Sequence, residues 1–154
     1  MEEALALAAE AAAEGEIPVG AVIADRDGNI IGRGRNRRES GDPLGHAELF
    51  AIAEAAKAVG DWRLEGTTMV VTLEPCAMCA GALVNARVDR LIFGAHDPKA
   101  GFCGSLGNLV QDPRLNHRME VVGGFEEERA RILLQNFFQQ LRKRPGLTER
   151  WQSG

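Results

Sequence analysis

The sequence lacks the features that would mark a membrane or exported protein. Among its 154 residues, the longest apolar runs are too short to span a bilayer, so we expect no membrane association. A charged leader followed by an apolar stretch and a cleavage site is also missing, which favours a cytoplasmic location. Three cysteines are an odd number and do not suit a disulfide framework. Two of them form a C-x-x-C at Cys76 and Cys79, which indicates a metal or redox pair in a reducing compartment.

An excess of basic charge is lacking as well. The chain carries 18 Lys and Arg against 22 Asp and Glu, a net charge of −4, which disfavours a generic nucleic-acid binder. The charge is nevertheless uneven, with arginines at positions 33, 35, 37 and 38 and three consecutive basic residues at 142–144. A locally basic face on an acidic body is one interpretation, and a solvated surface without a partner is the other.

The length suits one domain over residues 1–154, and the 45% apolar content can form one core. Residue propensities and apolar periodicity predict helices over 2–14, 46–59, 75–86 and 126–143. Apolar and β-branched runs predict strands over 17–24, from Ile30 onward, and over 67–73, 90–95 and 119–123. The D-R-D-G-N sequence at 25–29 predicts a hairpin between the first two strands. We expect loops over 37–45 and 96–117, the second with room for one short helix.

Alternation of these elements indicates an α/β fold. The predicted order is α-β-β-α-β-α-β-β-α, in which helices cover a central five-stranded mixed sheet. We therefore expect a three-layer sandwich, with no repeat and no second domain.

The P-C-A-M-C segment at 75–79 is the first part of a candidate metal site. Pro75 suits the first turn of a helix, where its missing N–H costs nothing. Cys76 and Cys79 are three residues apart, so they share one face of that helix. The positive end of the helix dipole favours their thiolate forms. Two thiolates suit zinc, but a catalytic zinc takes three protein ligands and one water.

His46 is the natural third ligand, because the chain has only three histidines. Glu48 follows two residues later, about 200° around a regular helix. Both side chains can serve one site only if His46 lies at or just before the first turn. Zinc with two thiolates and an imidazole is formally neutral, so it should acidify water less than a three-histidine zinc does. We therefore expect Glu48 to act as the base and proton carrier.

Other interpretations apply to each motif alone. A C-x-x-C can be a redox pair or part of a structural zinc site. A structural zinc normally has a fourth Cys or His, and Cys103 is the only spare thiol. A redox pair needs no upstream H-x-E. The two motifs together favour catalytic zinc, and we expect Cys103, His96 and His117 to be structural.

H-A-E at 46–48 together with T-L-E-P-C-A-M-C-A-G-A at 72–82 resembles the cytidine/deoxycytidylate deaminase superfamily, whose signature and mechanism are established for the class. Within it, nearly the whole chain is similar to the bacterial tRNA-specific adenosine deaminases. The further matching segments are I-P-V-G-A-V at 17–22, G-R-N at 34–36, the F-G-A-x-D-x-K-x-G-x-x-G-S pattern at 93–105, N-H-R at 116–118 and F-F at 137–138. The zinc motif is common to all members, so only these other segments bear on the substrate.

This resemblance implies a cytidine deaminase-like fold with one Zn²⁺ per subunit and conversion of adenosine to inosine at the wobble position of a tRNA anticodon. It implies that Asn36 hydrogen-bonds the flipped base and that Asp97 contacts the sugar. Phe138 and the basic residues after it would hold the anticodon stem-loop. The family pattern is a homodimer whose partner completes each active site. The sequence departs from it in a short N-terminus and in a tail after Arg144 that is less basic than a nucleic-acid arm.

Three functions remain open from the sequence. The first is tRNA adenosine deamination, for which Arg35, Arg37 and Arg38 become candidate phosphate contacts. The second is deamination of a free base or nucleoside such as guanine or cytidine, which the acidic net charge supports. The third is a zinc-stabilised RNA-binding module without catalysis, against which Glu48 argues, since structural zinc needs no such residue.

Overall fold

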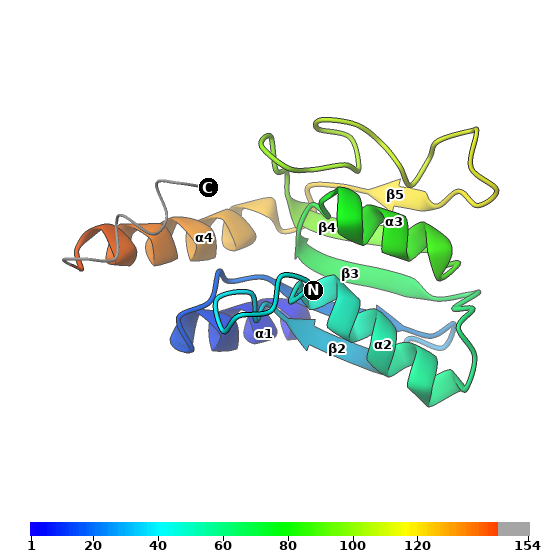
Figure 1. Cartoon of the computed structure of the whole chain (residues 1–154), viewed down its shortest axis with the longest axis horizontal. Coiled ribbons are helices and arrows are strands. Elements are labelled where there is room, and N and C mark those ends of the chain that lie inside the picture. The colour runs from blue at the N-terminus through cyan, green and yellow to red at the C-terminus, as the bar shows by residue number, and fades with distance from the viewer. Residues whose placement is uncertain (145–154) are drawn as a thin grey trace.

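A five-stranded mixed sheet organises the chain in the computed structural model, which describes residues 1–144 (Figure 1). Its strands are β1 (Gly20–Ala24), β2 (Ile30–Arg35), β3 (Thr68–Leu73), β4 (Arg90–Ala95) and β5 (Glu120–Val122). The spatial order is β2-β1-β3-β4-β5, with β1 antiparallel to both β2 and β3. The pairs β3–β4 and β4–β5 are parallel, so the predicted mixed sheet is confirmed.

Four helices cover the two faces of this sheet. They are α1 (Glu2–Ala13), α2 (Ala47–Val59), α3 (Ala77–Asn85) and α4 (Glu127–Arg142). Helices α2 and α3 contact each other on one face, and α1 and α4 contact each other on the opposite face. The predicted element order and the three-layer arrangement are therefore confirmed.

The sheet and α2 approach each other closely at Gly34. A Cβ added there would lie 2.0 Å from the carbonyl oxygen of Ala47, far inside van der Waals contact. Glycine at this position of β2 thus lets the first turn of α2 rest directly on the strand. This contact matters for function because α2 begins immediately after His46.

Three details differ from the sequence prediction. The first strand begins at Gly20 rather than at residue 17, because the Val19 N–H donates back to the Ile17 carbonyl at 2.8 Å and closes a turn. The helix expected from Pro75 begins at Ala77, with Cys76 still extended. The 96–117 segment contains turns and isolated bridges but no helix. No helix within residues 1–144 is long and apolar enough to cross a membrane.

Candidate metal centre and cavity

Two helix starts bring the predicted metal ligands together. His46 is the extended residue that precedes α2, as the spacing to Glu48 required, and Cys76 occupies the same place before α3. His46 Nδ1 lies 3.5 Å from the Sγ of Cys76 and 3.5 Å from the Sγ of Cys79. Residues 30 or more positions apart in the sequence therefore meet at one point.

These distances fit a tetrahedral zinc. Zn–S bonds of about 2.3 Å and a Zn–N bond of about 2.0–2.1 Å at a tetrahedral angle separate sulfur from nitrogen by about 3.5 Å. The three ligand atoms all lie within 4.8 Å of one another, so one ion can contact them all. The group has three members among the described residues, which leaves the fourth position of a tetrahedral metal for water. His46, Cys76 and Cys79 are thus positioned to bind one metal ion.

The electrostatics of this group favour a thiolate at Cys76. A hydrogen bond from the Cys79 thiol lowers the pKa of Cys76 to about 4, although burial opposes the shift. The same contact raises the pKa of Cys79, so the proton stays on Cys79. The hydrogen bond with Cys76 raises the pKa of His46. The two sulfurs and the imidazole compete for protons. A soft divalent cation would displace those protons, so this donor set suits a metal.

Glu48 lies in the first turn of α2 and is only 4% exposed. Burial raises its pKa, although a hydrogen bond with Cys79 opposes the shift. A raised pKa makes a buried carboxyl a stronger proton acceptor than a free one, as a group that accepts and returns protons must be.

A cavity of about 150 Å³ opens beside the ligand group. Its lining includes six residues that the sequence singled out or that flank them, namely Asn36, Arg38, His46, Glu48, Cys76 and Asp97. Cavities that hold drug-sized ligands measure about 300–1000 Å³, so this one suits a single nucleobase. The structure therefore brings the predicted base-contacting and sugar-contacting residues to the predicted metal ligands.

The two polar side-chain atoms of Asn36 have different surroundings. Its Oδ1 accepts a hydrogen bond from the Ala47 N–H at 3.0 Å and so satisfies a free donor at the start of α2. Its Nδ2 makes no hydrogen bond to any of residues 1–144. Every fully buried side-chain polar atom in these residues has a partner, so Nδ2 is not fully buried. The Nδ2 group is therefore accessible, and a donor is what Asn36 can offer to a base in the cavity.

Asp97 likewise combines a structural contact with a free atom. Its Oδ1 accepts the N–H groups of Lys99 and Ala100 at 3.1 and 3.2 Å, which stabilises the turn after β4. Its Oδ2 accepts no hydrogen bond from residues 1–144. A loop-stabilising role and a sugar contact are thus compatible in one side chain.

Phe138 lies outside this group. It is half-buried on α4, its ring centroid is 5.5 Å from that of the buried Phe137, and it does not line the cavity. Phe137 packs in the interior and is 7% exposed. The less basic tail after Arg144 lies outside the described residues.

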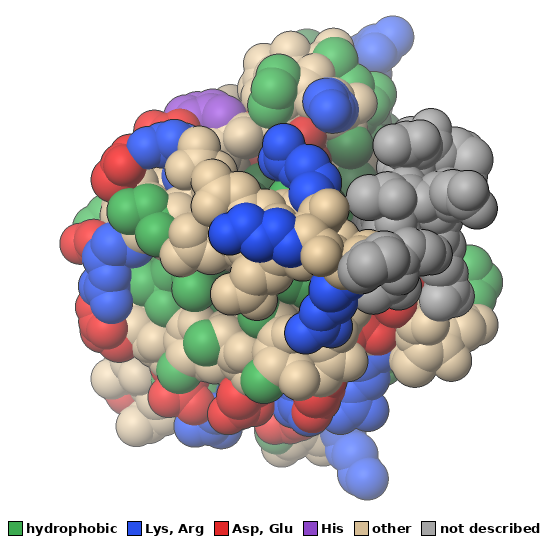
Figure 2. Space-filling view, turned by 90° about the vertical axis from the view of Figure 1, so that its left-hand side faces the viewer, with side chains coloured by type: hydrophobic (Ala, Val, Ile, Leu, Met, Phe, Trp, Pro, Cys, Tyr) green, Lys and Arg blue, Asp and Glu red, His purple; other side chains and the backbone are tan. Residues whose placement is uncertain are grey.

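The arginines near Asn36 differ in their surroundings. Arg35 hydrogen-bonds Glu14 through two nitrogens at 2.8 and 3.2 Å and lies 3.5 Å from Glu10. Arg38 lies 3.6 Å from one carboxylate, that of Glu39, and it lines the cavity and is exposed beside it. Figure 2 shows several Lys and Arg side chains on the end of the molecule that faces left in Figure 1, with acidic side chains around the rim. Arg38 is therefore better placed than Arg35 for a phosphate contact.

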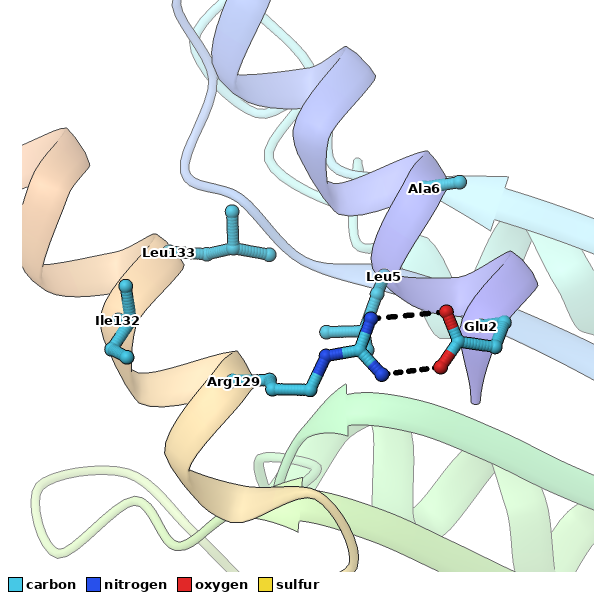
Figure 3. Close-up of a pocket in the computed structure, with 6 residues that line it drawn as sticks. All are labelled: Glu2, Leu5, Ala6, Arg129, Ile132 and Leu133. Atoms are coloured by element: carbon cyan, nitrogen blue, oxygen red, sulfur yellow. Dashed lines mark hydrogen bonds and ion pairs between the residues drawn. The ribbon is translucent and has the colours of Figure 1, made fainter.

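A larger cavity, of about 450 Å³, lies between α1 and α4 (Figure 3). Leu5, Ile132 and Leu133 form its apolar wall, and Glu2 forms an ion pair with Arg129 at one end. None of its lining residues is a thiol, an imidazole or a hydroxyl. The larger of the two cavities therefore lacks catalytic side chains, and we assign the chemistry to the smaller cavity beside the metal ligands.

Glu74 is a residue that the sequence analysis missed. It lines the cavity, is 2% exposed, and accepts backbone N–H groups from the 97–105 loop. A charged residue inside the apolar T-L-E-P-C segment was the available signal, since buried charges require partners.

Known proteins are similar to this chain in sequence and in fold. The family model for the cytidine and deoxycytidylate deaminase zinc-binding region matches residues 1–95. A tRNA-specific adenosine deaminase of Bacillus subtilis (strain 168) is 51% identical over 145 residues, which cover 94% of this chain and 89% of that protein. Its counterpart in Haemophilus influenzae is 46% identical over 144 residues, covering 93% and 83%.

Solved structures agree. A structure from work on A-to-I editing by tRNA:A34 deaminases at the wobble position has a TM-score of 0.82 and 42% identity, and the match covers 87% of this chain and 97% of that one. A guanine deaminase from Nitrosomonas europaea, at 23% identity and a TM-score of 0.77, shares the fold.

Proposed function

The chain belongs to the tRNA-specific adenosine deaminases of the cytidine and deoxycytidylate deaminase family, and we propose from this premise that it converts adenosine to inosine at the wobble position of a tRNA anticodon. Water is consumed and ammonia is released. The observation that supports this most strongly is a base-sized cavity that joins a three-ligand metal group to the buried Glu48.

Zinc held by His46, Cys76 and Cys79 would lower the pKa of a water and so supply the nucleophile. Glu48 would accept one proton from the attacking water and pass it to the ring nitrogen. It would then carry the second proton, from the oxygen newly added to the ring, to the amine that leaves as ammonia. The walls of the cavity exclude bulk water from the carboxyl and keep its pKa raised.

The remaining contacts orient the substrate. The Asn36 amide group donates to an acceptor on the base, and Asp97 Oδ2 accepts from a sugar hydroxyl. Because the cavity holds only a base, the rest of the anticodon loop must lie on the surface, where Arg38 can meet a phosphate. The half-buried Phe138 and the exposed basic residues 142–144 extend this surface along α4 and just beyond its end.

We assign the active form to a homodimer in the cytoplasm. The homodimer is what the family resemblance implies. Free thiols at the metal group require a reducing compartment. Light scattering at micromolar concentration tests the dimer, and a strictly monomeric active enzyme would contradict it.

Deamination of a free base is the second candidate. The small cavity favours it, and a structure at 27% identity was solved in complex with 2,6-diaminopurine. The two candidates separate in one experiment, in which zinc-loaded protein is given an anticodon stem-loop with a wobble adenosine, the same stem-loop with guanosine there, free guanine, or cytidine. Nucleoside analysis should find inosine only with the first. Turnover of guanine or cytidine without inosine from the stem-loop would contradict the proposal.

A further inference from the structure

The carboxylate of Glu74 takes no part in the deamination chemistry, yet it lies at the wall of the cavity. It follows β3 directly, is 2% exposed, and precedes Pro75 and Cys76, the two residues just before α3. Burying a carboxylate costs free energy unless donors replace the lost water. No ion pair among residues 1–144 includes Glu74, so hydrogen bonds alone must offset that cost.

Four donors from one loop surround the carboxylate. Oε1 accepts the Asp97 N–H at 3.1 Å and the Ser105 hydroxyl. Oε2 accepts the N–H groups of Cys103 at 3.1 Å and of Ser105 at 3.0 Å. These four hydrogen bonds replace the water that the buried carboxylate has lost. One charged side chain thereby joins the two ends of the 97–105 loop.

The loop is shaped around this carboxylate. A Cβ added at Gly101 would lie 2.3 Å from Glu74 Oε2 and 2.6 Å from the Asp97 carbonyl oxygen, so no side chain fits there. The Phe102 N–H donates to the Pro75 carbonyl at 2.9 Å, and Gly101 pairs with Cys76 in an isolated bridge. The loop thus rests on the same segment that supplies a metal ligand.

We propose that Glu74 is a positioning residue for substrate binding, because its carboxylate fixes the loop that presents Asp97 to the cavity. This inference rests on the proposed function, in which Asp97 contacts the sugar of the flipped nucleotide. Asp97 is held at its own N–H by Glu74, while its Oδ1 stabilises the turn that follows. Only Oδ2 remains for the substrate, and its direction depends on where Glu74 holds the backbone.

The loop on the other side of the cavity is held in a similar way. Glu16, which is 5% exposed, accepts the N–H groups of Glu39 at 2.9 Å and Ser40 at 3.0 Å. That loop includes Arg38, which lines the cavity. Glu16 therefore provides a matched comparison: it is the same residue type with the same kind of contact, on a different loop.

The direct test is Glu74→Gln, with Glu120→Gln on the exposed strand β5 as the control. The amide keeps one acceptor and turns its other end into a donor that faces backbone N–H groups. Zinc content should remain at one per chain, because no ligand changes. The KM for the stem-loop should rise about tenfold, the effect of losing about 1.4 kcal/mol, while kcat changes by less than about threefold. If KM is unchanged, or if kcat falls by as large a factor as KM rises, the inference is overturned.

A double-mutant cycle with Asp97→Asn tests whether Glu74 acts through Asp97. If it does, the double variant should have a KM within about twofold of the worse single variant. If the effects of the two substitutions on KM multiply, Glu74 supports the fold in general and the inference is wrong. Ser105→Ala, which removes one donor only, should raise KM in the same direction by less, and it serves where Glu74→Gln fails to fold.

Amide hydrogen exchange tests the loop without any substrate. Glu74→Gln should lower protection at residues 97, 103 and 105 and leave residues 39 and 40 unchanged, and Glu16→Gln should do the reverse. If exchange changes in this pattern but the wild-type protein forms no inosine, the proposed function fails and the loop assignment stands. If protection in the 97–105 loop stays as in the wild type, the positioning role is refuted.

Discussion

Gly34→Ala should disturb the metal centre indirectly, because it places one methyl group between β2 and α2. The added Cβ would lie 2.0 Å from the Ala47 carbonyl oxygen and 2.9 Å from the Ala51 nitrogen. Real Cβ contacts essentially never fall below 3.0 Å, so the start of α2 must move by about 1 Å. His46 and Glu48 move with it, because they lie just before and within the first turn of that helix.

The expected losses follow from that displacement. Overpacking of this kind lowers the free energy of unfolding by about 1–3 kcal/mol. Metal–ligand distances tolerate about 0.2 Å, so zinc affinity should weaken. A misplacement of about 1 Å costs roughly 100-fold in turnover. Urea unfolding, zinc competition with a chelator and single-turnover inosine formation measure the three effects.

Gly81→Ala is the matched control. Gly81 lies within α3, where an added Cβ meets no atom within 4 Å, so stability should stay the same or rise by about 0.5–1 kcal/mol. Wild-type zinc affinity and turnover in Gly34→Ala would refute the claim that contact between β2 and α2 sets the position of His46 and Glu48.

Four further outcomes are expected. Glu48→Ala should keep one zinc per chain but lose inosine formation, and Cys79→Ala should lose zinc, both measurable by elemental analysis beside the activity assay. Arg38→Ala should reduce the slope of log RNA affinity against log salt by about one, whereas Arg35→Ala should not, because Glu10 and Glu14 already pair with Arg35. The lowered pKa of Glu74 means that its carboxylate stabilises the fold above the ordinary value of 4.5, and this contribution is lost as the pH falls through the lower folded value. The stability difference between wild type and Glu74→Gln should therefore shrink on acidification below 4.5, and a constant difference would contradict the shift.

The element order and the metal group were predictable from the sequence because their signals are local. The H-x-E and C-x-x-C spacings are short, and the angular argument placed His46 before the first turn, where the structure has it. The first strand was predicted too long, because an apolar run does not reveal that Val19 bonds back to Ile17. Apolar content alone does not distinguish a strand from a tight turn that precedes it.

The partners of the polar groups could not be predicted in the same way. Glu74 contacts donors 23 to 31 residues later, and Asn36 contacts an amide 11 residues later. Arg35 pairs with Glu14, which lies 21 residues earlier, just after a helix that packs beside β2. Such contacts depend on which elements become neighbours, and no local spacing records that.

The most direct test of the central claim is inosine formation on a wobble-adenosine stem-loop, measured as a function of zinc occupancy in the wild type and in Glu48→Gln. The account predicts a rate proportional to the fraction of chains with zinc in the wild type, and no inosine from fully occupied Glu48→Gln. Inosine formation by that variant, or none by a fully occupied wild type, would contradict it.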